Sequence, residues 1–584
     1  MLNSRTRATF AWSKGSALRV AGVSFVLAVA ALRYRAFLMP MVRMEAIQVS
    51  EYAFVLFSTL AIIALYAGFG ERLRMPRFLQ SRWLILLAVP LLGAAVYRLG
   101  MHQFGGFDEG LVAHAAACYR QGMRPYADFL CTVPPFFMAG IRADGMLFGL
   151  RWGALQWLSA GFTAVTTLWM YWLLRRLRLP REWALLLTVM VELCTMVSCP
   201  FWWYNNTSIV LATLVFLSVL VCLERPELTS AWLSLAIAIG MVLAAKPNTL
   251  PILALVVLFF WRPVPGWRAR AALAMCFGVL LAAGICRFAQ MPLRPLLASY
   301  AEVASLRGNV FSLLPLRQGV WPERDLQIVL LFLCALGFAA AMLAALCRRP
   351  RDLRPVAACA IAGVASLLMG ATNAEWKHTD LSLLLLAVLL LNLRPWEAAN
   401  SGTTYRLRSP WLVGWLAGFL LMSVYFSAIH LRIWGIGEAM FYEPAATVKV
   451  QGGFLDGLEA APRLRRVQTE VRQVLDVHPG ERIFFGPRME FEYAAMARPP
   501  LSGKPLLWDS GNLFAPSRLP ELLLRFQQHD PDVLIFLKND FTRMGIVSYY
   551  IQRSATYRRD ESYSDLTVFV RDRTVPISLI RLPR

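Results

Sequence analysis

Two adjacent acidic residues, Asp108 and Glu109, are the first candidates for chemistry in this chain. They follow a glycine pair, Gly105-Gly106, inside the polar segment 101–151, which separates long apolar blocks. Acidic residues favour the first turn of a helix, so the pair predicts a helix that begins there and runs to about Gln121. A carboxylate at such a place can accept a proton from a hydroxyl group. A plain helix cap on a solvated loop is the alternative role.

Basic residues at the ends of apolar blocks are candidates for binding an anionic group. Lys246 lies in AAKPNTLP, where Pro247 and Asn248 predict a tight turn, and Lys377-His378 lies in TNAEWKHTD. A lysine there can make charge-assisted contacts with a phosphate. It can also extend along apolar surface to lipid headgroups, and both roles stay open. The segment 290–326 offers further charged residues, which the spacing does not rank: Arg307, Arg317, Glu302, Glu323 and Asp325.

Metal and thiol chemistry have little support. His102 and His114 flank the acidic pair, but their spacing is not a zinc-ligand pattern, and we expect solvated loop histidines. The ten cysteines include no C-x-x-C pair. These residue patterns therefore do not predict a particular cofactor. A divalent cation held by Asp108 and Glu109 stays open as an alternative.

The elements that must position these residues are membrane helices. Of 584 residues, 58% are hydrophobic and 16% are charged, against about 45–50% and about 25% in ordinary soluble domains. The apolar residues form blocks near the ~20 residues that cross a bilayer. The net charge of +23 is distributed in short arginine clusters between these blocks, as in cytoplasmic loops, and not on one face as in nucleic-acid-binding domains. We therefore predict a multi-pass membrane protein that binds membrane lipids and no nucleic acid.

The positive-inside rule orients the predicted spans. Four arginine clusters lie in connections that fall on one side if the spans alternate, and the rule makes that side the cytoplasm. The segments 101–151 and 290–326 and everything after 431 then lie outside. No cleavable signal peptide is expected. The predicted spans are 18–33, 51–69, 83–100, 152–174, 183–200, 206–223, 230–245, 249–261, 271–289, 327–346, 355–371, 380–394 and 411–430.

The chain changes character near Arg432. An amphipathic helix is expected from Arg463, and short apolar strands are expected over Arg482–Phe485, Asp532–Leu537 and Leu566–Val570, with a helix over Leu519–Gln528. The predicted fold class is thus an all-α polytopic bundle of about 11–13 transmembrane helices with a C-terminal extracytoplasmic α/β domain. The predicted domains are 1–430 and 431–584. Trp508, Asp509 and Asn512 are weak candidates for sugar contacts.

The loop after the acidic pair resembles a known superfamily. The pair is followed by a helix, then by G-x-x-P-Y-x-D-F and a Pro-Pro pair. This order resembles the GT-C superfamily of membrane glycosyltransferases, which includes protein O-mannosyltransferases and lipid A aminoarabinose transferases. Only residues 104–135 match at motif level, and up to three spans precede the acidic loop where many members have one. The residues that carry the second half of the pattern are Gly122, Pro125, Tyr126, Asp128, Phe129, Pro134 and Pro135.

The resemblance implies a reaction and a location. Such enzymes transfer a sugar, here with inversion, from a polyprenyl-phosphate carrier to a glycan, lipid or protein acceptor of the cell envelope, on the outer face of the inner membrane. It implies that Asp108 is the general base, with Glu109 as second choice. It also implies substrate-binding roles for Tyr126, Asp128 and the basic residues Lys246, Lys377 and His378.

Two other classes of protein fit the spans. A transporter also has about a dozen, and Lys246 could serve as an intramembrane charge, but transporters show paired half-repeats that this sequence does not reveal. A non-catalytic envelope-assembly protein could keep the fold without the chemistry, although the acidic pair argues against that.

Overall fold

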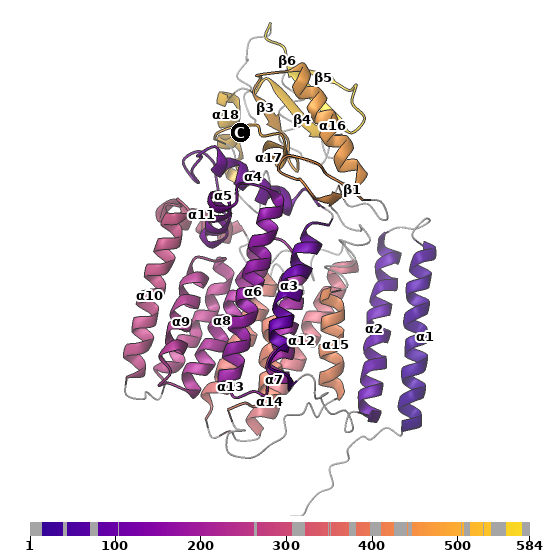
Figure 1. Ribbon diagram of the computed structural model, residues 1–584, viewed down its shortest axis with the longest axis vertical. Coiled ribbons are helices and arrows are strands. Elements are labelled where there is room, and N and C mark those ends of the chain that lie inside the picture. Colours follow the sequence, from indigo (N-terminus) through magenta and orange to yellow (C-terminus); the bar gives the residue numbers. More distant parts are fainter. Residues whose placement is uncertain are drawn as a thin grey trace, which may run out of the picture.

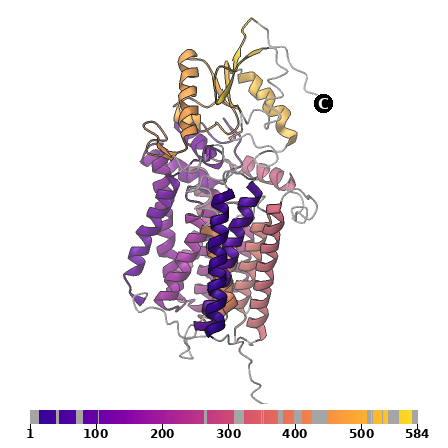
Figure 2. The same cartoon turned by 90° about the vertical axis from the view of Figure 1, so that its right-hand side faces the viewer.

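The chain forms a helical bundle with a small sheet at one end. The computed structural model describes residues 14–38, 44–69, 80–102, 104–261, 266–306, 322–347, 350, 352–372, 381–396, 410–424, 441, 447–503, 505–506, 514, 516–529, 531–538 and 556–574. Figure 1 shows the bundle below, the sheet and its helices above, and short helices between them. Figure 2 shows the same order of layers after a turn of 90°.

Apolar helices build the bundle, and each of the thirteen predicted spans coincides with one of them. Three are long and apolar enough to cross a membrane (α1, α8 and α10), and seven described helical segments are apolar but shorter. The bundle helices are α1 (Lys14–Leu38), α2 (Met44–Phe69), α3 (Leu84–Gly100), α6 (Trp152–Arg176), α7 (Arg181–Glu192) with the π-helix η2 (Leu193–Val197), α8 (Tyr204–Glu224), α9 (Thr229–Leu243), η3 (Pro247–Phe259), α10 (Trp267–Phe288), α12 (Pro322–Cys347), α13 (Arg354–Thr372), α14 (Ser382–Leu393) and α15 (Pro410–Val424).

Burial separates the central helix from the outer ones. The span window of α8 is 100% buried, whereas those of α1 and α10 are 22% and 17% buried. Helix α8 packs with α9, η3 and α6. An apolar helix with little burial suits contact with lipid, and one buried on every side suits the centre of a bundle.

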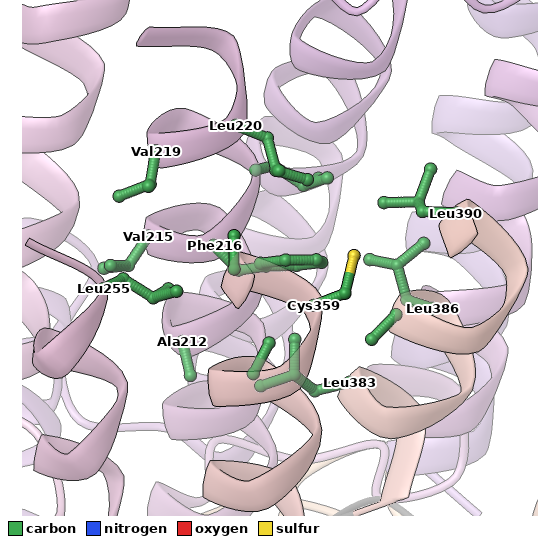
Figure 3. Close-up of a cluster of buried hydrophobic side chains, with 14 of the residues drawn as sticks. Ala212, Val215, Phe216, Val219, Leu220, Leu255, Cys359, Leu383, Leu386 and Leu390 are labelled. Carbon is green, nitrogen blue, oxygen red and sulfur yellow. The ribbon is translucent and has the colours of Figure 1, made fainter. Parts of the chain in front are cut away.

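An apolar, buried core joins α8 to α13 and α14. Phe216 and Leu220 of α8 face Cys359 of α13 and Leu386 of α14 in Figure 3, and all four are fully buried. At the edge of the bundle α9 and α10 approach closely at Gly240 and Gly278. A Cβ on Gly240 would lie 2.9 Å from the Gly278 carbonyl oxygen. Small residues allow such backbone contact between membrane helices.

One predicted span has a different local structure. Residues 247–259 form the 3-10 helix η3 and not the α-helix expected over 249–261. Pro247 is the first helical residue, where the missing N–H costs nothing, but Pro251 lacks the N–H that an α-helix would donate to the Pro247 carbonyl. Two prolines at that spacing are the feature of the sequence that indicates a departure from the α-helix.

Three short helices form a layer between bundle and sheet: α4 (Asp108–Arg120), α5 (Pro135–Leu147) and α11 (Leu293–Leu306). Helix α4 begins at Asp108 as predicted, and Gln121 caps its end. Helix α5 begins at the second proline of the Pro134-Pro135 pair, a favoured first helical position.

The C-terminal residues form a mixed four-stranded sheet in the order β3-β4-β6-β5. The first two strands are parallel and the other neighbours antiparallel. All five residues of β4 are buried, as in a strand covered on both faces. The predicted strands and helices are present, and the sequence missed β5. The elements are β1 (Val448–Lys449), β2 (Glu459–Ala460), α16 (Pro462–Val477), β3 (Ile483–Phe485), α17 (Glu492–Ala495), η8 (Pro516–Arg518), α18 (Leu519–His529), β4 (Val533–Leu537), β5 (Tyr557–Asp560) and β6 (Leu566–Arg571).

The arginines between the apolar blocks lie at the end of the bundle that is far from the sheet, as the directions of α6 and α10 show. The Trp152 N–H donates to the Phe454 carbonyl at 2.7 Å, so α6 begins beneath the C-terminal residues. Its 25 residues place Arg175 and Arg176 at the other end, about 37 Å away. Helix α10 ends at Phe288 beside α5, so Arg268 and Arg270 also lie at the far end.

Candidate functional site

Helix α4 holds the acidic pair at the layer between bundle and sheet. Asp108 is its first residue and is half-buried, whereas Glu109 is only 4% exposed. Neighbouring helical residues point about 100° apart, so the two carboxylates face different surroundings. The helix N-terminus favours a negative charge at Asp108.

A tight turn fixes the entry to α4. Gly106 has a φ of +82°, and a Cβ there would lie 2.8 Å from the Phe441 ring. Glycine is therefore required by both conformation and space. Phe104 and Phe441 each meet the Phe491 ring edge-on, at 5.1 and 5.6 Å between centroids. The turn before Asp108 is thus packed against the segment that follows β3.

That segment places a cation on the residue that precedes the acidic pair. The Arg488 guanidinium lies over the Phe107 ring, 5.2 Å from its centroid, and Phe107 directly precedes Asp108. Arg488 has a φ of +70°, which is uncommon for a residue with a side chain. No motif or spacing indicated this contact, since Arg488 lies 380 residues after Asp108.

Further contacts join α4 to the C-terminal residues. The His114 ring stacks on Tyr493 at 5.2 Å, and its Nδ1 donates to the Leu506 carbonyl at 2.5 Å. His114 is fully buried, so the expectation of a solvated loop histidine was wrong. Next to Tyr493, burial raises the pKa of the Glu492 carboxyl to about 8, against the opposing effects of Arg472 and Gln468. The sequence could not show that α4 is covered in this way.

His102 is also held. Its Nδ1 lies 3.1 Å from Glu459, which forms a two-pronged ion pair with Arg98 at 2.8 and 2.9 Å. Within the described residues, no group of three or more His, Cys, Asp or Glu side chains could hold a metal ion.

Tyr126 and Asp128 lie in the turn that follows α4. The Asp128 carboxylate accepts the Arg124 backbone N–H at 2.7 Å, and its carbonyl accepts the Gly503 N–H at 2.7 Å. Asp128 therefore stabilises the turn and its contact with the C-terminal residues. Tyr126 has a φ of +67°, and burial, ahead of the nearby Cys131, raises the pKa of its phenol.

Lys246 lies half-buried in the connection between α9 and η3. Its Nζ donates to Asn205 Oδ1 at 2.8 Å and lies 5.3 Å from the centroid of the Tyr204 ring. The half-buried ammonium group faces the start of α8, which does not fit an extension to lipid headgroups.

The Pro134-Pro135 end of the loop reaches the same turn. The Phe136 N–H donates to the Ala244 carbonyl at 2.9 Å, and Phe137 meets the Tyr204 ring edge-on at 5.9 Å. The structure thus brings Lys246 and the second half of the loop motif together. Lys377, His378, Trp508, Asp509 and Asn512 lie outside the described residues.

Comparisons with known proteins found similarity to solved structures. No protein-family model and no curated protein matches the chain. ArnT from Cupriavidus metallidurans bound to undecaprenyl phosphate is similar with a TM-score of 0.49 and 15% identity, over 84% of this chain and 98% of that one. The apo state of that protein is similar with a TM-score of 0.47 and 15% identity, over 83% and 97%. ArnT is an aminoarabinose transferase, a kind of protein that residues 104–135 resemble.

Proposed function

We propose that this chain is an integral membrane glycosyltransferase. It transfers a sugar from a polyprenyl-phosphate carrier to an envelope glycan, lipid or protein, with Asp108 as the general base. The observation that carries the proposal is the position of Asp108: it begins α4 in the layer between bundle and sheet, with the Arg488 guanidinium over the neighbouring Phe107.

The chemistry requires one carboxylate and cationic partners. The acceptor hydroxyl gives its proton to Asp108 while its oxygen forms a bond to the anomeric carbon. The bond from that carbon to the phosphate oxygen breaks, and the electron pair leaves with the polyprenyl phosphate. A leaving group that is already anionic needs positive charge and no general acid. Attack opposite to the departing phosphate inverts the anomeric centre.

Three cations are assigned to the donor phosphate in this proposal. Arg488 lies over Phe107, the residue before the acidic pair, and Lys246 follows the Ala244–Ala245 turn that the Pro134-Pro135 end of the loop contacts. Lys377, with His378 next to it, keeps the role that the resemblance implies. Tyr126 supports substrate binding at the turn, and Asp128 holds that turn against the C-terminal residues.

The side of the membrane is part of the proposal. The arginines of the α6–α7 connection and of the α10 start lie at the bundle end away from the sheet. By the positive-inside rule, that arrangement supports a cytoplasmic position for them and an extracytoplasmic position for Asp108 and the C-terminal domain. There the domain covers α4 and contributes to the choice of acceptor.

Two measurements test the reaction class. Purified protein in proteoliposomes is supplied with polyprenyl-phosphate sugars and with an envelope extract as acceptor, and release of the free carrier is measured. Envelope glycans and lipids from cells with and without the gene are compared by mass spectrometry. We expect carrier release and a mass difference of one sugar residue. Unchanged envelope glycans and lipids, with no carrier release from any donor, would contradict the proposal.

A further inference from the structure

A groove lined by arginines runs along the outer edge of the layer, away from the acidic pair. It consists of two adjoining hollows of about 720 and about 730 Å³ that share Arg142 and Gln290. Arg124 and Arg287 line the first hollow, and Arg120 and Arg151 line the second. The groove therefore lies where the end of α4, the helix α5 and the end of α10 meet.

The charge of this groove has one sign. Among the residues that the structure describes, no acidic side chain lines either hollow. The two neighbouring acids do not line the groove. Asp128 accepts the Arg124 backbone N–H, and Asp144 is buried. Five arginines line the two adjoining hollows. Their positive charge attracts anions, and the planar forks of guanidinium groups match phosphate oxygens.

The groove opens beside surfaces that suit lipid chains. Leu147, at the end of α5, is 72% exposed, and Leu280, on α10, is 71% exposed. Arg142 connects the two helices, because it donates to the Phe288 carbonyl and lies 5.3 Å from the centroid of the Phe288 ring. Arginines next to exposed apolar side chains are typical of a membrane boundary, where the cations contact lipid headgroups and the apolar side chains contact acyl chains.

We propose that this arginine groove binds the phosphate headgroup of an anionic glycerophospholipid, whose acyl chains lie along α10. Tyr126, which supports substrate binding in the function proposed above, also lines the first hollow, but distance argues against the donor phosphate as the occupant of the groove. Asp108 and Arg120 are at opposite ends of α4, about 18 Å apart. A leaving phosphate is bonded to the carbon under attack and must lie near the base. The groove is thus a second phosphate site, and its lipid anchors the layer that carries Asp108.

The test counts bound lipid in the full-length protein. Protein in nanodiscs of phosphatidylglycerol and phosphatidylcholine is released from the bilayer, and retained lipids are identified by native mass spectrometry. The variant is Arg124→Gln/Arg287→Gln, which leaves Arg142 and its contact with Phe288 intact. The matched control is Arg465→Gln/Arg558→Gln, which removes the same charge from exposed positions of the C-terminal domain.

We expect the groove variant to lose phosphatidylglycerol and the control to keep it. An arginine near a membrane surface changes lipid affinity about fivefold, so two should change it about 25-fold. Phosphatidylcholine retention should be the same in all three proteins. Equal retention of phosphatidylglycerol by variant and wild type would overturn the proposal, and so would an equal loss in the control. If the groove variant instead kept phosphatidylglycerol and lost an added polyprenyl monophosphate, the groove would be a site for the donor, and the proposal would be wrong. The count needs no turnover, so it stands apart from the glycosyltransferase assay.

Discussion

The core of the bundle and the layer above it differ in what they bury. In the core, α8 and α14 contact each other and α13 through side chains such as Phe216, Leu220 and Leu386, which offer no titratable group. In the layer, Glu109, His114 and Asp144 are buried, and Asp108 lies half-buried beside the Phe107–Arg488 contact. Buried polar groups cost free energy unless partners compensate. The bundle also buries an acid, Glu192, which accepts the Thr166 hydroxyl at 2.7 Å, so burial alone does not mark a site. The layer differs because Asp108 stays half-buried at the start of a helix.

The largest effect on stability should come from the core. Leu220→Ala removes a fully buried side chain and should lower the free energy of unfolding by about 2–5 kcal/mol. Leu280→Ala makes the same chemical change on the exposed face of α10 and should have little effect. Thermal unfolding in detergent measures both. Equal losses would show that the core and the lipid-facing surface do not differ as described.

The core was also the part that the sequence predicted best. Its helices are long apolar blocks, and a block near 20 residues in a chain of this composition has few other structures available. The exception, η3, shows the limit of hydropathy. Hydropathy does not distinguish an α-helix from a 3-10 helix, and only the spacing of Pro247 and Pro251 carried that information.

A pH effect should separate the C-terminal domain, which packs on the layer, from the core of the bundle. Burial raises the pKa of Glu492 to about 8, so the folded protein keeps a proton that the unfolded chain releases above its ordinary value of 4.5. Stability should therefore fall as the pH rises from about 5 to about 8. Glu492→Gln should reduce that fall by about 2–4 kcal/mol. Thermal midpoints at pH 5 and pH 8 test this, with the exposed Glu561→Gln as control. An unchanged pH dependence in Glu492→Gln would show that Glu492 is ionised in the folded protein.

The candidate site was predictable in part. The type and spacing of Asp108, Pro125 and Pro134 lie within one short segment, so a motif could reveal them. Arg488 comes from the other end of the chain, and only tertiary packing brings it over Phe107. Lys246 was selected because it interrupts apolar residues, but its partner Asn205 could not be read from spacing.

Arg488 tests whether the C-terminal domain completes the site. Arg488→Gln should lower kcat/KM for sugar transfer by about 10–100-fold, the usual loss for a charge-assisted contact. Arg488→Lys should recover part of it. Arg498→Gln, on the same segment, serves as the control. Equal activity of Arg488→Gln and wild type would confine the chemistry to the membrane part.

Lys246 should have the smallest of these effects. Lys246→Met keeps an unbranched side chain of nearly the same length and removes its charge, so the KM for the donor should rise about 3–10-fold with little change in kcat. Lys377→Ala should also raise the KM. The exposed Lys449→Met is the control. A Lys246→Met protein with an unchanged KM would leave that lysine a structural partner of Asn205 and Tyr204.

The central claim is that Asp108 takes the acceptor's proton, and single-turnover sugar transfer by Asp108→Asn tests it most directly. Asparagine keeps the size of the side chain and caps a helix about as well, so the variant should fold and bind the lipid-linked donor. Without the base, the rate of transfer should fall by roughly 10²–10⁴-fold, while Glu109→Gln should retain most of the activity. Transfer by Asp108→Asn at the wild-type rate would contradict the account.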